Sequence, residues 1–327
     1  MFETRRPNQR VSAVSDLSAS FCSLRLSGEQ RKKNMAVGAI IALALITAYS
    51  AFGINHYIAS NANPIVEFVL GTTYRNVLYA NSQTMDIYIT NTTGSDALPV
   101  VIYVHGGGLT AGDKSDINTS LLNAFASSGF IVASINYRLA PQHRFPAQIE
   151  DVKSAIRYLR ANAQEYHINA SEIFAYGDSS GGTLVSLAAL TSSNSVFDTG
   201  PYLNQSSRIE AGIDLFGESN FTELISPSDP AVHGICGNET NLVLASPTHF
   251  VSKNASPLLI IQGVDDTNVP ESQSIQLYND LKDSGAQTKL ILVQNAGHEF
   301  VQVGNQPISP SREQITQDMV SYFEQHA

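Results

Sequence analysis

The amino-acid sequence predicts an α/β fold with a mostly parallel sheet that carries helices on both of its faces. Short apolar runs rich in Val, Ile and Leu recur along the chain, and helical patterns separate several of them. This alternation favours a parallel sheet, because each crossover helix returns the chain to the same end of the sheet. The carboxyl ends of the strands, and the loops that follow them, then lie along one edge.

The element order follows from hydrophobic spacing. The expected strands, in chain order, are 76–80, 85–90, 99–104, 130–137, 173–176, 209–216, 257–262 and 288–293. The expected helices are 146–166, which has an amphipathic pattern, 183–190, and a closing helix that begins at Ser311. At that last start, Ser-Arg-Glu-Gln predicts a capping box with Gln314.

The pentapeptide G-D-S-S-G at 177–181 lies between the predicted strand 173–176 and the predicted helix 183–190. Glycine on both sides lets the chain bend sharply and lifts the Ser179 hydroxyl clear of the sheet. A serine on such a strand-to-helix turn is typical of a nucleophile elbow. Taken alone, the pattern fits a small-residue turn with a solvated serine equally well.

The glycine triplet 106–108 follows the apolar run 99–104 at the carboxyl end of a predicted strand. Residues without Cβ let backbone N–H groups approach a ligand there. An ester hydrolase needs such donors where the carbonyl oxygen becomes an oxyanion. Gly107, Gly108 and the N–H of Ser180 are the candidate donors, and an ordinary glycine-rich turn is the alternative. A phosphate-binding loop is excluded, because no Gly-Lys-Ser/Thr follows.

Two strands further along the chain also end in residues suited to proton transfer. Asp265 and Asp266 follow the run 257–262, and His298 follows the run 288–293. Serine, aspartate and histidine in this order, each after a different strand, are typical of a Ser-His-Asp triad on an α/β-hydrolase scaffold. His298 would take the serine proton, and a carboxylate would hold its tautomer. The spacing leaves both aspartates open for that role.

Several further motifs accompany these. They are His105-Gly-Gly-Gly, Gly112-Asp113-Lys114, Asn136-Tyr137-Arg138-Leu139-Ala140-Pro141, Phe145-Pro146-Ala147 with Glu150-Asp151-Val152, and Gly177-Asp-Ser-Ser-Gly-Gly. Together they resemble α/β-hydrolase esterases of the hormone-sensitive-lipase-like and feruloyl-esterase-like (BD-FAE) groups, from about Met85 to the C-terminus. In those esterases the acid lies in a Gly-x-x-Asp-x-x-Val-Pro loop, so the resemblance implies Asp266 as the acid beside Ser179 and His298.

The chain departs from that pattern at two positions. Such esterases commonly carry an aromatic residue after the glycine triplet and a histidine before the glycine of the acid loop. Here Leu109 and Gln262 stand at those positions. Neither position is catalytic in the family, so the departures bear on the shape of the pocket.

Composition agrees with one enzyme domain. The 327 residues are 43% hydrophobic and 15% charged, which allows a substantial core. A formal charge of −10 argues against binding of nucleic acid. Cys22 and Cys236 lie in different regions, so no disulfide is expected within the hydrolase domain, and Cys236 is interpreted as a small buried residue. Among the other histidines, His143, His167, His233 and His249 show no metal-ligand spacing, and no metal or organic cofactor is expected.

The N-terminal part divides into a basic tail at 1–34, an apolar segment at 35–55 and a linker at 56–71. The uncharged stretch 36–54 approaches the roughly 20 residues that cross a bilayer as a helix. Arg31, Lys32 and Lys33 precede it, and positive charge there predicts a cytoplasmic N-terminus with the enzyme on the far side of the membrane. Both a retained single-pass anchor and a signal that is cleaved to release a secreted protein remain open.

The hydrolase domain is expected at 72–327, with a small cap at 218–254, where periodicity is lost and polar residues abound. The sequence predicts a serine carboxylesterase that acts on small or short-chain esters through an acyl-enzyme. Hydrolysis of amides or formamides, or acyl transfer, by the same residues is the alternative. A silent membrane-tethered binding module would carry a broken triad, and all of the parts are present. A small-molecule ester and the membrane are the expected partners, and the oligomeric state is not predicted.

Overall fold

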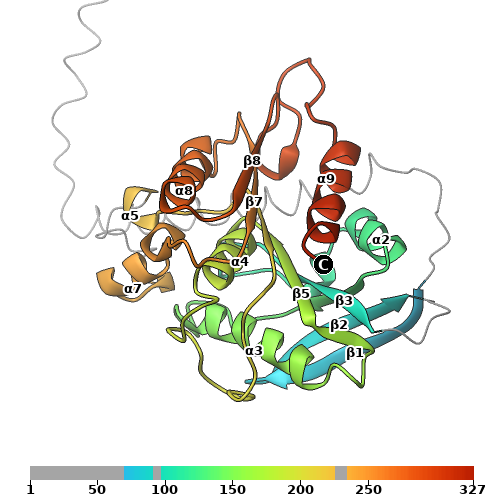
Figure 1. Ribbon diagram of the computed structural model, residues 1–327. Helices are drawn as coiled ribbons and strands as arrows, with labels where there is room; N and C mark the ends of the chain where they lie inside the picture. Colours follow the sequence, from blue (N-terminus) through green and yellow to red (C-terminus); the bar gives the residue numbers. More distant parts are fainter. Residues whose placement is uncertain (1–69, 91–96, 225–233) are drawn as a thin grey trace, which may run out of the picture. The chain divides into compact units, whose positions relative to one another are not determined.

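The computed structural model describes residues 70–90, 97–224 and 234–327 (Figure 1). The strands are β1 (Leu70–Ala80), β2 (Gln83–Thr90), β3 (Leu98–Val104), β4 (Ile131–Ile135), β5 (Ile168–Asp178), β6 (Gly212–Leu215), β7 (Leu258–Gly263) and β8 (Thr288–Val293). The helices are α2 (Thr119–Ser127), α3 (Ala147–Ala161), α4 (Ser180–Leu190), α5 (Phe221–Leu224), α7 (Glu239–Leu244), α8 (Glu271–Ser284) and α9 (Arg312–Glu324). Short 3-10 turns lie at η1 (Lys114–Asp116), η2 (Pro247–Phe250) and η3 (His298–Phe300).

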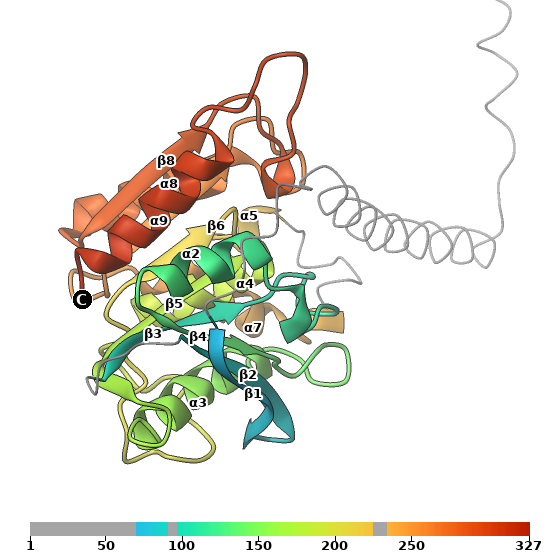
Figure 2. The ribbon, with the colours of Figure 1, turned by 90° about the vertical axis from the view of Figure 1, so that its right-hand side faces the viewer.

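These strands form an 8-stranded sheet in the order β1-β2-β4-β3-β5-β6-β7-β8. The pairs from β4 through β3 to β8 are parallel, whereas β2 pairs antiparallel with both β1 and β4. Figure 2 shows the β1–β2 hairpin and the β8 edge at opposite ends of the sheet. The parallel strands therefore direct β3, β5, β7 and β8 toward one common edge. The predicted α/β architecture with a mostly parallel sheet is confirmed.

Alternate side chains of the central strands enter two separate cores. In β3, Val100, Ile102 and Val104 pack in the core formed with α3, α4 and α8. Val101 and Tyr103 face the other way, into the core formed with α2 and α9. Because successive side chains of a strand point to opposite faces, each face of the sheet needs its own helical cover. Figure 1 shows that cover, with α2 and α9 on one side and α3, α4 and α8 on the other.

Four helices in the described residues, α2, α5, α7 and α8, were not foreseen, and several predicted ends were wrong. α2 and α8 lie in stretches without a predicted element, and α8 buries only Leu277 and Leu281 among its apolar residues, so its stripe is weak. The helix predicted over 146–166 ends at Ala161. Asn162 is the C-cap: its backbone N–H makes the ordinary i to i−4 bond to the Tyr158 carbonyl at 3.0 Å, and its side-chain amide donates to the same carbonyl at 2.8 Å.

The observed ends of several strands also differ from the predicted ends. β1 and β5 extend beyond the predicted 76–80 and 173–176, because bulges and backbone pairing let polar residues join the ladder. β6 is shorter than 209–216. Ser311 is the N-cap of α9, as predicted, and accepts from the Gln314 N–H at 3.2 Å. The predicted capping box also requires a bond between the Gln314 side chain and the Ser311 backbone. In the structure, the Gln314 side chain donates to Asp318 at 3.2 Å instead.

The predicted N-terminal tail at 1–34 and apolar segment at 35–55 lie outside the described residues. β1 begins at Leu70, within the stretch predicted as a linker. Over the ranges that are described, no helix has the length and apolar character needed to cross a membrane. The predicted cap at 218–254 contains α5, α7 and η2 in its described parts.

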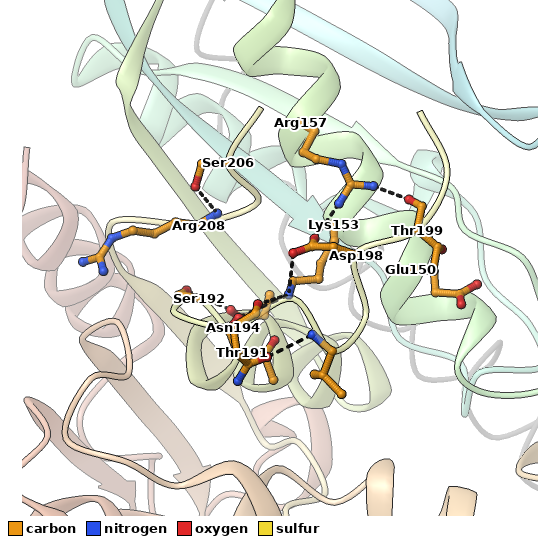
Figure 3. A network of polar contacts seen from close by, with 12 residues as sticks. Glu150, Lys153, Arg157, Thr191, Ser192, Asn194, Asp198, Thr199, Ser206 and Arg208 are labelled. Atoms are coloured by element: carbon orange, nitrogen blue, oxygen red, sulfur yellow. Dashed lines mark hydrogen bonds and ion pairs between the residues drawn. The ribbon is translucent and has the colours of Figure 1, made fainter. Parts of the chain in front are cut away.

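Two buried cations on α3 fasten the loop that follows α4 (Figure 3). Lys153 is fully buried, and its Nζ donates to the carbonyls of Thr191 and Asn194 at 3.2 and 3.3 Å. Arg157 is 1% exposed, and its Nη1 lies 2.6 Å from Asp198 Oδ1. The second oxygen of that carboxylate lies 3.7 Å from Lys153 Nζ. One carboxylate is thus shared by two cations in a site from which water is largely excluded.

The other two nitrogens of the Arg157 guanidinium also donate hydrogen bonds. Its Nη2 donates to Ser154 Oγ at 2.9 Å and to the Thr199 carbonyl, and its Nε donates to the Pro201 carbonyl at 3.1 Å. A buried cation is tolerated when its donors are bonded and its charge is compensated. Removal of the shared carboxylate would leave two buried charges without that compensation.

We therefore expect Asp198→Asn to lower the free energy of unfolding by about 3 kcal/mol or more. The matched control is Glu210→Gln, which breaks the surface pair with Arg208 (N···O 3.7 Å, side chains 43% and 32% exposed). That change should cost less than about 1 kcal/mol. Urea unfolding of the two variants measures the difference, and equal losses would contradict the role given to Asp198.

Candidate active site

Ser179 occupies a sharp turn between the end of β5 and the start of α4. Its backbone has φ +52° and ψ −124°, a conformation that non-glycine residues rarely adopt. Its N–H donates to the Leu215 carbonyl at 2.8 Å, which ties the turn to β6. A Cβ on Gly181 would lie 2.1 Å from the Val104 carbonyl oxygen, so only glycine fits there. The predicted elbow geometry is present, and it carries the Ser179 hydroxyl to the carboxyl edge of the sheet.

His298 lies between the hydroxyl of Ser179 and a carboxylate. It follows β8 at the start of η3, and its Nε2 is 3.2 Å from Ser179 Oγ. Its Nδ1 is 2.7 Å from Asp266 Oδ2. These residues are far apart in the chain and meet because β5, β7 and β8 are parallel and end at the same edge. With Nδ1 as the donor, Nε2 is free to accept the serine proton.

The two adjacent aspartates differ in placement. The side chain of Asp266 is 0% exposed, and its Oδ1 accepts from the N–H groups of Asn268 and Val269 at 2.8 and 2.9 Å. Asp265 is exposed, and its N–H donates to the Ala296 carbonyl at 2.9 Å. Asp266 is therefore the one of the two that contacts His298, in the register that the resemblance implied.

The pKa values of this pair shift in opposite directions. Burial lowers the pKa of His298, but the hydrogen bond and charge of Asp266, with a further contribution from Glu218, outweigh burial and raise it above its usual value. Burial raises the pKa of Asp266, but His298 and the two backbone donors outweigh it and leave the carboxyl pKa lowered. Each partner thus stabilises the charged form of the other.

The glycine turn lies against the elbow. A Cβ on Gly106 would be 2.6 Å from Asp178 Oδ2, and the N–H of Leu109 donates to Ser180 Oγ at 3.2 Å. Gly107 and Gly108 have φ of +108° and +61°. The Gly107 carbonyl accepts from N–H groups further along the turn. The segments that hold the predicted donors Gly107, Gly108 and Ser180 are therefore brought together, and their role in binding an oxyanion stays a prediction.

Strained backbone gathers at this edge. Besides Ser179, the residues Leu109, Phe216, Glu299 and Phe300 have positive φ, between 47° and 60°. Such conformations persist where the surrounding structure enforces them, and they are common at functional sites. Phe216 follows β6, and its ring packs edge-on against His298 with centroids 4.8 Å apart. Phe216 was not predicted, although its place after a parallel strand was a signal that could have found it.

The histidines other than His298, and Cys236, were also considered as candidates from the sequence. His105 is buried, stacks on Tyr137 with centroids 4.2 Å apart, and has its pKa lowered by burial. Cys236 is a free, buried thiol whose pKa burial raises to about 11, as expected for a small core residue. His143, His167 and His249 are exposed, while His233 and Cys22 lie outside the described residues. Within the described residues, no group of three or more His, Cys, Asp or Glu side chains is placed to hold a metal.

Comparison with known proteins identifies a family. The BD-FAE family model matches residues 85–281. The chain belongs to the BD-FAE family. It is thus an α/β-hydrolase of the esterase type, as the resemblance implied. A solved carbohydrate esterase from gut microbiota, in truncated form, is 30% identical with a TM-score of 0.70, and the match covers 80% of this chain and 98% of that one.

Two curated relatives of this BD-FAE chain come from Mycobacterium tuberculosis. Esterase LipC is 28% identical over 69% of this chain and 59% of its own length. The probable carboxylic ester hydrolase LipM is 31% identical over 54% of this chain and 43% of its own length. The chain thus spans about half the length of the curated relatives it matches. Esterase 2 of Thermogutta terrifontis, solved with butyrate bound, shares the fold at 20% identity and a TM-score of 0.63, with 79% of this chain and 94% of that one covered.

The pKa shift of His298 leads to a test that needs no substrate. A protonated imidazole cannot accept the Ser179 proton, and the pKa of His298 lies above its usual 6.5. We therefore expect a neutral fluorophosphonate to label Ser179 slowly in acid and faster as the pH rises through a value above about 6.5. Intact-mass kinetics from about pH 5 to pH 9 measure this, with Ser179→Ala as the unlabelled control. A labelling rate that does not depend on pH would contradict the assignment.

Proposed function

We propose that the chain is a serine carboxylesterase that hydrolyses small or short-chain esters through an acyl-enzyme intermediate. The observation that carries the proposal is the position of His298, 3.2 Å from the Ser179 hydroxyl and 2.7 Å from the Asp266 carboxylate. Membership of the BD-FAE family and the esterase names of the relatives support it.

In the first half of the reaction, Ser179 Oγ attacks the ester carbonyl carbon while its proton moves to His298 Nε2. The positive charge on the imidazole is stabilised by Asp266, which keeps its own negative charge. The carbonyl oxygen becomes an oxyanion, for which the N–H groups of Gly107, Gly108 and Ser180 are the proposed donors. Collapse of the tetrahedral intermediate breaks the bond to the alcohol, which leaves with the proton from Nε2.

In the second half, water takes the place of the alcohol. His298 Nε2 removes a proton from the water as its oxygen attacks the acyl carbon on Ser179. Collapse of this second tetrahedral intermediate breaks the bond to Ser179 Oγ and releases the carboxylic acid, while His298 Nε2 returns its proton to Ser179 Oγ. These steps use side chains and backbone N–H groups of this chain together with one water molecule, and no atom changes its oxidation state.

The proposed preference for short acyl groups rests on the polar character of residues 218–254. In their described parts, Glu239 and Thr240 begin α7, and Thr222 and Glu223 lie in α5. A longer acyl chain gains affinity only where its methylenes are buried, at about 0.8 kcal/mol each. The butyrate bound to esterase 2 of Thermogutta terrifontis is consistent with short acyl groups in this fold.

The adjacent carboxylates test the catalytic assignment. Asp266→Asn should reduce kcat by about 10⁴-fold, because an amide favours the wrong tautomer of His298. Asp265→Asn changes the same chemical group on an exposed neighbour and should cost less than about tenfold. Steady-state hydrolysis of p-nitrophenyl acetate measures both. A larger loss at Asp265 would reject Asp266 as the acid.

The acyl preference is tested with p-nitrophenyl esters of increasing chain length, beside the matching aryl amides. We expect kcat/KM to peak between acetyl and butyryl esters and to be much lower for every amide. A steady rise out to dodecanoyl esters would instead indicate a lipase, and amide turnover equal to ester turnover would favour the amidase alternative. Ser179→Ala should abolish all hydrolysis, by about 10⁶-fold.

We further propose that residues 35–55 anchor the enzyme in a membrane, with residues 72–327 on the extracytoplasmic side. The support is the uncharged stretch 36–54 and the basic cluster before it. The full-length protein should then remain in the membrane fraction after alkaline carbonate and be released by detergent. An active, shortened protein in the medium would establish signal cleavage, and a cytosolic protein with an intact N-terminus would reject both versions.

A further inference from the structure

Gln262 is a fully buried amide on β7, four residues before the candidate acid. A buried amide is costly unless its polar atoms are hydrogen-bonded. Its Oε1 accepts from Ser274 Oγ of α8 at 2.9 Å. Its Nε2 lies 3.1 Å from the carbonyl oxygens of Gly263 and Val269 and 3.2 Å from Asp266 Oδ2. One side chain therefore joins the end of β7, the loop of the acid and the first turns of α8.

The carboxylate of Asp266 is surrounded by four donors. Oδ1 accepts from the N–H groups of Asn268 and Val269. Oδ2 accepts from His298 Nδ1 at 2.7 Å and from Gln262 Nε2 at 3.2 Å. A carboxylate offers about four lone-pair directions, two on each oxygen. The Gln262 amide thus occupies the lone-pair direction on Oδ2 that His298 does not use. As a result, the carboxyl group cannot rotate without breaking hydrogen bonds on both oxygens.

We propose that Gln262 is a positioning residue, which holds Asp266 in its bonded orientation and thereby tunes the proton affinity of His298. The inference deepens the proposed esterase function and rests on it. The N–H end of the amide is the positive end of its dipole and faces Oδ2, the oxygen that also faces His298. A positive partial charge there weakens the pull of the carboxylate on a second cation. Gln262 therefore opposes protonation of His298 and keeps more of it in the neutral, reactive form.

The choice of glutamine also matters for pH. A histidine in place of Gln262 would gain a charge between about pH 5 and pH 8. The amide of Gln262 does not titrate, so its bond to Asp266 is the same throughout that range. Glu218 and Glu299 also raise the pKa of His298, and Asp178 lies close enough to interact with it. These carboxylates stay in place when Gln262 is replaced, so its contribution can be measured alone.

The test is the acid limb of the pH profile of kcat/KM, which reports the pKa of the base in the free enzyme. Gln262→Met and Gln262→Leu both remove the amide donor and replace it with apolar side chains of different shape. Both should move the acid limb upward by about half a unit to one unit, a threefold to tenfold change in proton affinity. They should also lower the plateau several-fold, and Gln262→His, which restores a donor, should recover the plateau.

Gln273→Met is the matched control in the full-length protein. Gln273 is also a buried amide (2% exposed), but its Oε1 accepts from the N–H groups of Ser219 and Asn220. Its replacement should cost comparable stability in urea unfolding and leave the acid limb where it is. If the donorless Gln262 variants lose stability like Gln273→Met and the acid limb does not move, Gln262 is only structural and the proposal is wrong.

A second readout does not depend on turnover. The proton on His298 Nδ1, bonded to a carboxylate, should give a downfield NMR signal that shifts as the ring is protonated. In Gln262→Met that titration should move upward by the same amount as the acid limb. A shifted titration in a protein that hydrolyses no ester would reject the esterase function and retain the role of Gln262. An unshifted titration would reject that role, whatever the protein hydrolyses.

Discussion

The turn at Ser179 depends on backbone segments that approach more closely than a Cβ would allow. A Cβ on Gly181 would lie 2.1 Å from the Val104 oxygen, and one on Gly177 would lie 2.4 Å from the Gly181 carbonyl. With these glycines, β5 can end and α4 can begin within a single residue, which forces φ of Ser179 to a positive value. The half-buried hydroxyl then lies at the edge where the other strand ends meet. The glycine turn, the acid loop and the histidine are useful only because of that placement.

Around this point the site is held by hydrogen bonds that serve folding and chemistry together. Asp266 is buried, yet its lowered pKa keeps it ionised because His298 and the backbone of its own loop compensate the burial. His298 in turn is held between that carboxylate and the ring of Phe216. A preorganised base of this kind needs little rearrangement when charge develops on it. Away from the site, the two cations of α3 connect that helix to the loop after α4 by ion pairs with Asp198.

Much of this site could be predicted from the sequence, because its residues stand directly after apolar runs. Ser179 and His298 follow strands that show as apolar runs in the sequence, and parallel strands bring such positions together. The choice between Asp265 and Asp266 could not be made from spacing alone. It depended on the turn of one loop, and the resemblance to esterases supplied it. In the structure, Asp266 is the one of the two aspartates that contacts His298.

Gln262 and Phe216 stand at the ends of predicted strands, but the sequence did not predict the contacts that they make. Both depend on which face of a strand a residue occupies and on its rotamer, and a pattern of apolar residues specifies neither. The same holds for α8, whose buried face includes Gln273 and Ser274 and therefore shows little hydrophobic period. Helix ends such as Asn162 depend on one side-chain bond. The alternation of strands and helices thus follows from the apolar runs, while the polar contacts around the candidate site require coordinates.

The central claim is that three loops converge on one reacting atom, and a crystal structure of the phosphonylated protein tests it most directly. We predict phosphorus on Ser179 Oγ and its phosphoryl oxygen within about 3 Å of backbone N–H groups of Gly107, Gly108 or Ser180. His298 should remain bonded to Asp266. Phosphorus on another residue, or a phosphoryl oxygen directed away from the glycine turn, would contradict the account.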